Sequence, residues 1–173
     1  MGEKMMYASK IPAYFILDVD GVMTNGSFLY SEKGKAYKSF GPHDNDGIKL
    51  IQPHLATIFV TADERGFPIS KQRIVEDMKQ PLLLLKEEER FSYLMEHYNL
   101  AESIYMGDGL YDAKILRRCL FGIAPANARI EAKQAAQFVT PSSGGEGAVL
   151  DACLKILEIF FPAQSTSLQH QLN

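Results

Sequence analysis

The sequence lacks most features that mark secreted, membrane and nucleic-acid-binding proteins. Its 173 residues include only two cysteines, Cys119 and Cys153, in apolar surroundings, so we expect reduced core thiols rather than disulfides. No apolar run reaches transmembrane length, and the first ten residues have no signal-peptide core. The net charge of −3 argues against a generic binder of nucleic acid or membrane surfaces. We expect a cytoplasmic protein with one domain over residues 1–161 and a flexible tail over residues 162–173.

The most informative stretch covers residues 18–24 and reads Asp-Val-Asp-Gly-Val-Met-Thr. It follows the apolar run at residues 14–17, which predicts a buried strand. Strand alternation would point Asp18 and Asp20 the same way, and Gly21 lets the backbone turn sharply. Two acids held close repel each other, so they need a cation, a proton or a charged substrate between them. Aspartate can also be a covalent nucleophile, so the stretch favours a catalytic site over an acidic turn.

Apolar strands alternate with helical segments along the chain. Strands are expected at residues 14–19, 56–61, 82–85, 104–106, 120–124 and 137–140, and helices at 46–51, 70–78, 91–98, 129–136 and 149–160. A hairpin is expected between residues 28 and 40, and the apolar run at 82–85 suits a buried strand. The alternation predicts a doubly wound parallel α/β sheet with its active site at the carboxyl ends of the strands.

Three groups of polar residues follow expected strands. They are Asp18 with Asp20, Thr61 alone, and Asp108 with Asp112. Each has a structural alternative, because Thr61 could simply end a strand, Asp108 could form an Asx-turn and Asp112 could cap a helix. Since parallel strands end at one edge of the sheet, we expect all three groups to meet there.

These residues resemble the motifs of the haloacid dehalogenase superfamily of phosphatases. The chain is most similar to the small capless branch that includes 3-deoxy-D-manno-octulosonate 8-phosphate phosphatase. Residues 18–26 match the first motif, with Asn25 where relatives usually have aspartate. Thr61 matches the second motif and residues 107–112 match the fourth. The marks of the branch are Phe40, residues 44–50 and the glycine-rich loop at 144–148.

The resemblance implies a Mg²⁺-dependent phosphatase with a protruding β-hairpin and no separate cap domain. Asp18 would attack phosphorus and become an aspartyl-phosphate, while Asp20 would act first as an acid and then as a base. The Asp18 carboxylate, the Asp20 backbone carbonyl and Asp108 would hold Mg²⁺, with Asp112 supporting that site. Thr61 would donate its hydroxyl to a phosphoryl oxygen. The substrate side is expected to include Thr24, Gly26, Thr61, Arg65 and Glu146.

Two departures from the family pattern concern its cations. The third motif normally supplies a lysine, but a strict alignment places Glu87 at that position. A shift of one residue would place Lys86 there, and we expect Lys86 to be the catalytic cation. The alternative is that residues 86–90 form a solvated run of charges at the start of a helix. Relatives usually read Thr-Gly-Arg in the second motif, where this chain has Asp63 as the third residue. Without that arginine, recognition of a sugar acid would weaken unless Arg65 reaches in.

By this resemblance the substrate is a phosphorylated 2-keto-3-deoxy sugar acid, with 3-deoxy-D-manno-octulosonate 8-phosphate preferred. The alternatives are a nonulosonate 9-phosphate, an unrelated small metabolite, or a catalytically weakened module like those associated with acylneuraminate cytidylyltransferase. The apolar hairpin at residues 28–40 favours a homotetramer in which neighbouring subunits complete each active site.

Overall fold

The computed structural model describes residue 7 and residues 10–172. In this part of the chain six parallel strands form one sheet in the order β5-β4-β1-β6-β7-β8. The strands are β1 (Tyr14–Asp18), β4 (Ala56–Thr61), β5 (Leu82–Leu84), β6 (Ser103–Met106), β7 (Phe121–Ala124) and β8 (Phe138–Val139). The predicted parallel α/β sheet is therefore confirmed.

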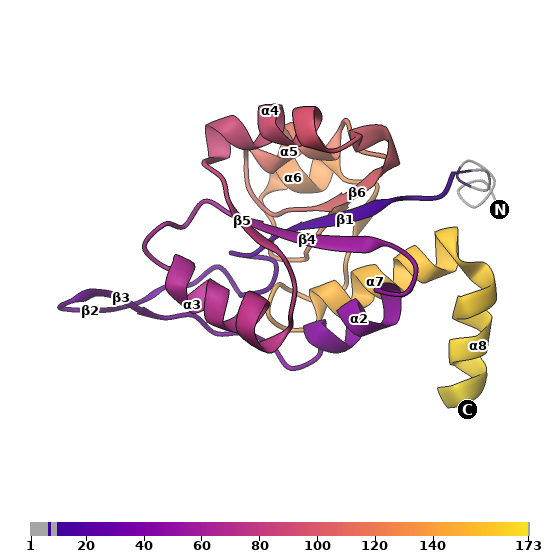
Figure 1. Cartoon of the computed structure of the whole chain (residues 1–173), viewed down its shortest axis with the longest axis horizontal. Coiled ribbons are helices and arrows are strands. Elements are labelled where there is room, and N and C mark those ends of the chain that lie inside the picture. The colour runs from indigo at the N-terminus through magenta and orange to yellow at the C-terminus, as the bar shows by residue number, and fades with distance from the viewer. Residues whose placement is uncertain (1–6, 8–9, 173) are drawn as a thin grey trace.

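Helices cover both faces of the sheet (Figure 1). One face carries α4 (Glu87–His97), α5 (Asp112–Leu116) and α6 (Ile130–Ala135), and the other carries α2 (Asp44–Ile51), α3 (Phe67–Lys71) and α7 (Ala148–Phe160). Helix α3 continues as a π-helical segment at Gln72–Asp77, and a short 3₁₀ helix spans Leu100–Glu102. No separate cap covers the sheet in the described part of the chain.

Strand β1 organises the molecule because it lies between β4 and β6. Its register sets Asp18 beside Val60 of β4, and Leu17 beside Met106 of β6. The residues that follow these strands therefore emerge at one edge of the sheet. Along β1, Phe15 belongs to the core on one face and Ile16 to the core on the other, as strand alternation requires. Burial of each such side chain stabilises the fold by about 1.5–3 kcal/mol.

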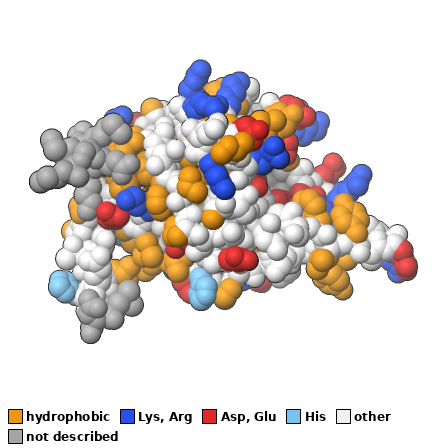
Figure 2. All heavy atoms as spheres, turned by 180° about the vertical axis from the view of Figure 1, so that it is seen from behind, with side chains coloured by type: hydrophobic (Ala, Val, Ile, Leu, Met, Phe, Trp, Pro, Cys, Tyr) orange, Lys and Arg blue, Asp and Glu red, His pale blue; other side chains and the backbone are white. Residues whose placement is uncertain are grey.

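The expected hairpin is present and extends away from the sheet (Figure 1). It consists of β2 (Leu29–Ser31) and β3 (Gly34–Tyr37), which pair antiparallel, and an isolated bridge between Thr24 and Phe40 closes its base. Figure 2 shows hydrophobic side chains along the projecting arm. The arm thus exposes apolar side chains, as the sequence indicated, while its tip is charged.

Two segments differ from expectation. Strand β5 lies at the edge of the sheet and is half-exposed rather than buried, because only β4 pairs with it. Helix α8 (Pro162–Leu172) follows α7 where no helix was expected, and Figure 1 shows it bending away from the end of α7. The Phe161 ring stacks on His54 at 4.9 Å between centroids, and Leu168 packs against the core, so apolar contacts hold this segment. Among the described residues, none of the helices combines the length and hydropathy needed to cross a membrane.

Candidate active site

A cavity of about 330 Å³ opens at the carboxyl ends of the central strands. It is lined by residues from the turn after β1, the hairpin, α4 and the two loops after β6 and β7. These are Asp18, Asp20, Gly26, Phe28, Glu87, Arg90, Asp108, Gly109, Leu110, Tyr111, Asp112 and Arg129. Thus Asp18, Asp20, Asp108 and Asp112 do meet at one edge, as their positions after the strands predicted. Their spacing allows the cavity to hold a small charged ligand.

Asp18 ends β1 and is paired with a buried arginine. The NH1 atom of Arg90 lies 3.1 Å from Asp18 Oδ1 and 3.1 Å from Asp112 Oδ1. Burial raises the pKa of Asp18 well above its usual range, Arg90 opposes this rise, and Asp112 adds to it. Burial alone would lower the pKa of Arg90, but Asp18, Tyr105 and Asp112 together outweigh burial and raise that pKa. Arg90 is therefore a fixed positive charge beside the expected nucleophile.

Asp112 is the first residue of α5, and both its oxygens have partners. The Tyr105 hydroxyl donates to Oδ1 at 2.5 Å, and the Gly109 backbone N–H donates to Oδ2 at 2.8 Å. The side chain thus stabilises the turn after β6 and also contacts Arg90. It does not cap α5, whose N-cap residue is Tyr111 and has no side-chain cap hydrogen bond. These contacts leave Asp112 well placed to orient the arginine.

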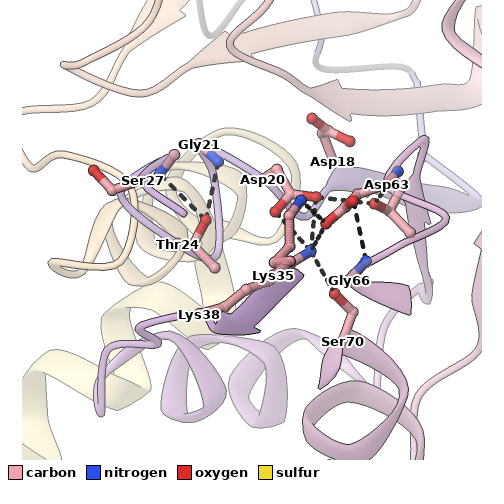
Figure 3. A network of polar contacts seen from close by, with 12 residues as sticks. Asp18, Asp20, Gly21, Thr24, Ser27, Lys35, Lys38, Asp63, Gly66 and Ser70 are labelled. Atoms are coloured by element: carbon pink, nitrogen blue, oxygen red, sulfur yellow. Dashed lines mark hydrogen bonds and ion pairs between the residues drawn. The ribbon is translucent and has the colours of Figure 1, made fainter. Parts of the chain in front are cut away.

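Asp20 has a different set of partners from Asp18. Strand β1 ends at Asp18, so strand alternation does not extend to Asp20, and the two carboxylates point apart (Figure 3). Lys38 Nζ lies 2.7 Å from Asp20 Oδ1 and 3.0 Å from Oδ2, and the Thr61 hydroxyl donates to Oδ2 at 2.9 Å. Each acid of the pair therefore has its own cation, Arg90 for Asp18 and Lys38 for Asp20.

Three carboxylates are close enough to share a metal ion. One oxygen from each of Asp18, Asp108 and Asp112 lies within 4.8 Å of the other two. Burial and then the charge of Asp112 raise the pKa of Asp108 to about 7. A divalent cation bound by hard oxygen ligands would offset this repulsion, so the donor set fits such an ion.

The turn after β1 requires glycine at position 21. Its φ is +86°, and a Cβ there would lie 2.1 Å from Asp108 Oδ2. Thr24 holds the turn, because its hydroxyl oxygen accepts hydrogen bonds from the backbone N–H groups of Gly21 and Gly26, both at 3.2 Å. Gly26 lines the cavity, whereas the Thr24 side chain is buried in the turn (Figure 3). The expected substrate contact of Thr24 is thus replaced by a role in the backbone.

The glycine-rich loop supports the same turn. Asn127 donates from Nδ2 to the Gly21 carbonyl at 2.9 Å and accepts from the Gly144 N–H at 2.6 Å. The Gly145 N–H donates to the Val22 carbonyl at 3.1 Å. A Cβ at Gly144 would lie 2.0 Å from the Gly21 carbonyl oxygen, so only glycine permits this approach. The loop's contacts here are structural.

Five expected site residues do not line the cavity. Thr24 and Thr61 are buried, and the Thr61 hydroxyl donates to Asp20, while Lys86, Arg65 and Glu146 are exposed. The Lys86 side chain is 76% exposed, and its Nζ lies 3.9 Å from Glu89. Lys86 precedes α4 and extends into solvent, so the cation beside Asp18 is Arg90 instead. Arg65 and Glu146 are exposed on their loops and do not line the cavity. Glu87, the strict match to the family's lysine, does line it, at the side formed by the start of α4.

Sequence reasoning missed Arg90 and Lys38. Arg90 belongs to the charge run at residues 86–90, but it precedes the buried Leu94 by four residues, so helical spacing places both on the inner face. This helical spacing could have identified Arg90 as a buried residue from the sequence. Lys38 follows β3 and carries no comparable pattern, because its partners Asp20, Asp63 and Ser70 come from distant parts of the chain.

Comparison with known proteins agrees with this geometry. A family model described as haloacid dehalogenase-like hydrolase matches residues 88–152. The chain belongs to this superfamily, in its capless branch, and is a phosphoric monoester hydrolase.

Within the superfamily, the chain is similar to the 3-deoxy-D-manno-octulosonate 8-phosphate phosphatases. It is 33% identical to the Haemophilus influenzae enzyme over 150 residues, which cover 84% of this chain and 82% of the relative. A cobalt-bound structure of the Haemophilus influenzae phosphatase is 27% identical, with a TM-score of 0.78 over 94% of this chain and 97% of the other.

The phosphatase of Moraxella catarrhalis, solved with magnesium, phosphate and the sugar acid, shares the fold. Its TM-score is 0.80 at 23% identity, over 100% of this chain and 99% of the other.

Proposed function

We propose that the protein hydrolyses the phosphate ester of a 2-keto-3-deoxy sugar acid, with 3-deoxy-D-manno-octulosonate 8-phosphate as the leading candidate and Mg²⁺ as the cofactor. The observation that carries this proposal is the position of Asp18. Its carboxylate lies at the end of the central strand, lines the cavity and contacts Arg90. One of its oxygens also lies within 4.8 Å of an oxygen of Asp108 and of Asp112. The similarity to the octulosonate phosphatases supports the choice of substrate.

The metal would be held by the carboxylates of Asp18 and Asp108, with Asp112 beside them. When bound, Mg²⁺ supplies positive charge that draws a phosphate dianion toward an anionic nucleophile. One relative was solved in a cobalt-bound form and another with a magnesium ion, which supports a metal cofactor here. Arg90 supplies a second, permanent positive charge beside Asp18.

In the first half of the reaction, an Asp18 oxygen would form a bond to phosphorus as the bond to the sugar oxygen breaks. Asp20 would give its proton to that departing oxygen, so the sugar leaves as a neutral alcohol. Thr61 and Lys38 would hold the Asp20 carboxylate during this transfer. The product of this half is an aspartyl-phosphate on Asp18.

In the second half, Asp20 would take a proton from water, whose oxygen then attacks phosphorus. The Asp18–phosphorus bond breaks, inorganic phosphate leaves, and both carboxylates return to their starting states. Because Arg90 contacts Asp18 and Asp112 together, it would hold the nucleophile in place through both halves. A buried cation beside the nucleophile supports a phosphatase over a catalytically weakened module.

The substrate's carboxylate needs a partner other than residue 63. Asp63 stands where relatives usually have arginine, and it is held by Lys35 at 2.5 Å and Lys38 at 2.8 Å (Figure 3). Arg129, at the rim of the cavity, is a cation on the open side of the site. We propose that it faces the sugar acid, while Phe28 borders the sugar's apolar side.

The same proposal includes a homotetramer joined through the hairpins. Phe28, Leu29, Tyr30 and Tyr37 are all exposed on this arm, and Tyr37 is 69% exposed. Such a surface favours contact with a second copy of the chain. Since Phe28 also lines the cavity, a neighbour seated on the hairpin would border the active site.

The deciding experiment is a phosphate-release assay with Mg²⁺ on a panel of sugar-acid phosphates, including the octulosonate 8-phosphate and nonulosonate 9-phosphates. Preferential turnover of the octulosonate ester supports the proposal. Preference for a nine-carbon ester would change the substrate but keep the chemistry. No turnover of any phosphate ester, an aryl phosphate included, would refute it.

A further inference from the structure

Lys38 is the most heavily engaged cation of the described chain outside the Arg90 cluster. It follows β3 at the base of the hairpin, and its side chain is 0% exposed. Its Nζ lies 2.7 Å from Asp20 Oδ1, 2.8 Å from Asp63 Oδ2 and 2.9 Å from the Ser70 hydroxyl oxygen. An ammonium group has three donors, so these three partners use its full capacity.

Such a buried ammonium group is held in one place. Taking a lysine charge out of water is costly unless the charge is paired and hydrogen-bonded. Here two carboxylates and a hydroxyl surround it, and Lys35 at 2.5 Å supplies Asp63 with a second cation. The group therefore contains two lysines and two aspartates, in which both lysines contact Asp63 and Lys38 also contacts Asp20.

Asp63 remains ionised in this group. Burial would raise its pKa, but the hydrogen bonds from Lys35, Lys38 and the Gly66 N–H, with the charge of Lys38, together outweigh burial and lower that pKa. Asp63 is also tied to its own loop, because it accepts the Gly66 N–H at 3.1 Å. Lys38 is thus anchored from one side by Asp63 and Ser70, and it presents its remaining donor to Asp20.

The two contacts on Asp20 define its direction. Thr61 and Lys38 both reach Oδ2, and Lys38 also lies beside Oδ1. Figure 3 shows both lysines approaching from the hairpin side, opposite to the Asp18 carboxylate. Without Lys38, only the Thr61 hydroxyl would fix the Asp20 side chain, and Asp20 would face Asp63 without the cation between them.

We propose that Lys38 is a positioning residue that holds the Asp20 carboxylate in the orientation required for proton transfer to the leaving oxygen. The inference rests on the proposed phosphatase chemistry and extends it to a residue with no direct contact to substrate. A purely structural lysine that only anchors the hairpin is the competing explanation. The two explanations differ in which substrates are hydrolysed more slowly when Lys38 is replaced.

The test compares two leaving groups. An aryl phosphate such as p-nitrophenyl phosphate releases a phenolate that needs no proton, whereas an alkyl or sugar phosphate releases an alcohol that does. For each variant, kcat/KM is measured with Mg²⁺ on both esters, because this constant includes leaving-group departure but not hydrolysis of the aspartyl-phosphate. General acids contribute about 10²–10⁴-fold, so Asp20→Asn should lower kcat/KM by that factor for the alkyl ester and far less for the aryl ester.

Lys38→Met should show the same selectivity. We expect its kcat/KM to fall at least about tenfold more for the alkyl ester than for the aryl ester, because a misplaced general acid loses part of its roughly 10²–10⁴-fold contribution. Lys35→Met is the matched control, because it removes the neighbouring hairpin cation that binds Asp63 without contacting Asp20. Its ratio of the two constants should equal that of the wild type. Circular dichroism and thermal unfolding establish that each variant is folded.

Each outcome decides the matter. Equal losses on both esters in folded Lys38→Met, or none, overturn the positioning role. If that variant does not fold, Ser70→Ala, which removes one acceptor of Nζ, takes its place, and an unchanged ratio there overturns the role. A wild-type protein inactive on both esters refutes the proposed function itself, and an active wild type with an insensitive Asp20→Asn refutes the acid role of Asp20.

Discussion

Arg90 NH1 and Asp18 Oδ1 lie 3.1 Å apart in a buried ion pair that joins α4 to the end of β1. The same nitrogen lies 3.1 Å from Asp112 Oδ1, so one cation bridges the last residue of β1 and the first residue of α5. A buried cation shared in this way compensates charges that would otherwise be unpaired.

Loss of Arg90 should therefore destabilise the protein strongly. Arg90→Ala leaves Asp18 and Asp112 buried without their cation, and we expect the free energy of unfolding to fall by about 3–5 kcal/mol. Lys86→Ala is the matched control, because that side chain is 76% exposed. It should change stability by less than about 0.5 kcal/mol. Urea unfolding measures both, and equal effects would contradict the assignment of Arg90.

Asp18→Asn should abolish turnover while keeping the fold. We expect kcat to fall by at least about 10⁴-fold, as for other covalent nucleophiles. Because burial already raises the pKa of Asp18, removing this charge should leave the melting temperature unchanged or higher. Phosphate release and thermal unfolding test the two parts separately. Residual turnover within tenfold of the wild type would show that another group attacks phosphorus.

Without a metal ion, Asp108 should make the free energy of unfolding decrease as the pH rises. Its pKa is raised to about 7 in the folded protein, against about 3.9 in an unfolded chain. Between these two pH values Asp108 is protonated in the folded state and ionised in the unfolded state. The stability that the protonated Asp108 contributes at low pH is therefore lost as the pH rises through about 7. In urea unfolding with EDTA, the free energy of unfolding of Asp108→Asn should increase relative to that of the wild type as the pH increases. A constant difference would contradict this prediction.

Adding Mg²⁺ at neutral pH should raise the melting temperature of the wild type. A ligand at one hundred times its Kd stabilises a protein by about 2.7 kcal/mol, which for a chain of this size is a rise of several degrees. Asp108→Asn removes one carboxylate of the cluster and should lose most of this rise. The same rise in both proteins would place the ion elsewhere.

Charge on the hairpin should break the assembly. Leu29 and Tyr37 face each other across the two strands and are both exposed. Leu29→Glu with Tyr37→Glu should reduce the mass measured by light scattering to that of one 19.3 kDa chain. Lys33→Glu, in the turn of the same hairpin, changes charge without removing apolar surface and should keep the larger mass. A wild type that is already monomeric would contradict the tetramer.

Most of the fold was predictable because strands and helices leave local patterns. The apolar runs before Asp18, Thr61 and Asp108 located three strands, and the order of elements gave the parallel sheet. Helix α8 could not be inferred in this way, since its sequence is polar and its contact with the core, through Leu168, is made in three dimensions. Propensity alone did not predict this packing.

The acids of the site were predictable, whereas their cations were not. Asp18 and Asp20 follow a strand directly, so their positions depend on local sequence. Lys38 and Arg90 reach them from a hairpin and a helix, and only the tertiary arrangement brings these charges together. Lys86 was preferred because it is closer in sequence to the family's lysine, but it lies before the helix and extends into solvent.

The hairpin supplies more than a surface for contact. Lys35 and Lys38 lie within or just beyond the same arm that carries Tyr30 and Tyr37, so one short segment holds both the apolar exterior and two charges of the interior. An engineered exchange of this arm between related enzymes would transfer those charges together with the contact surface. Any monomer made by deleting the whole arm would also lose the counter-ion of Asp20, and its weak activity would then say nothing about the need for neighbours.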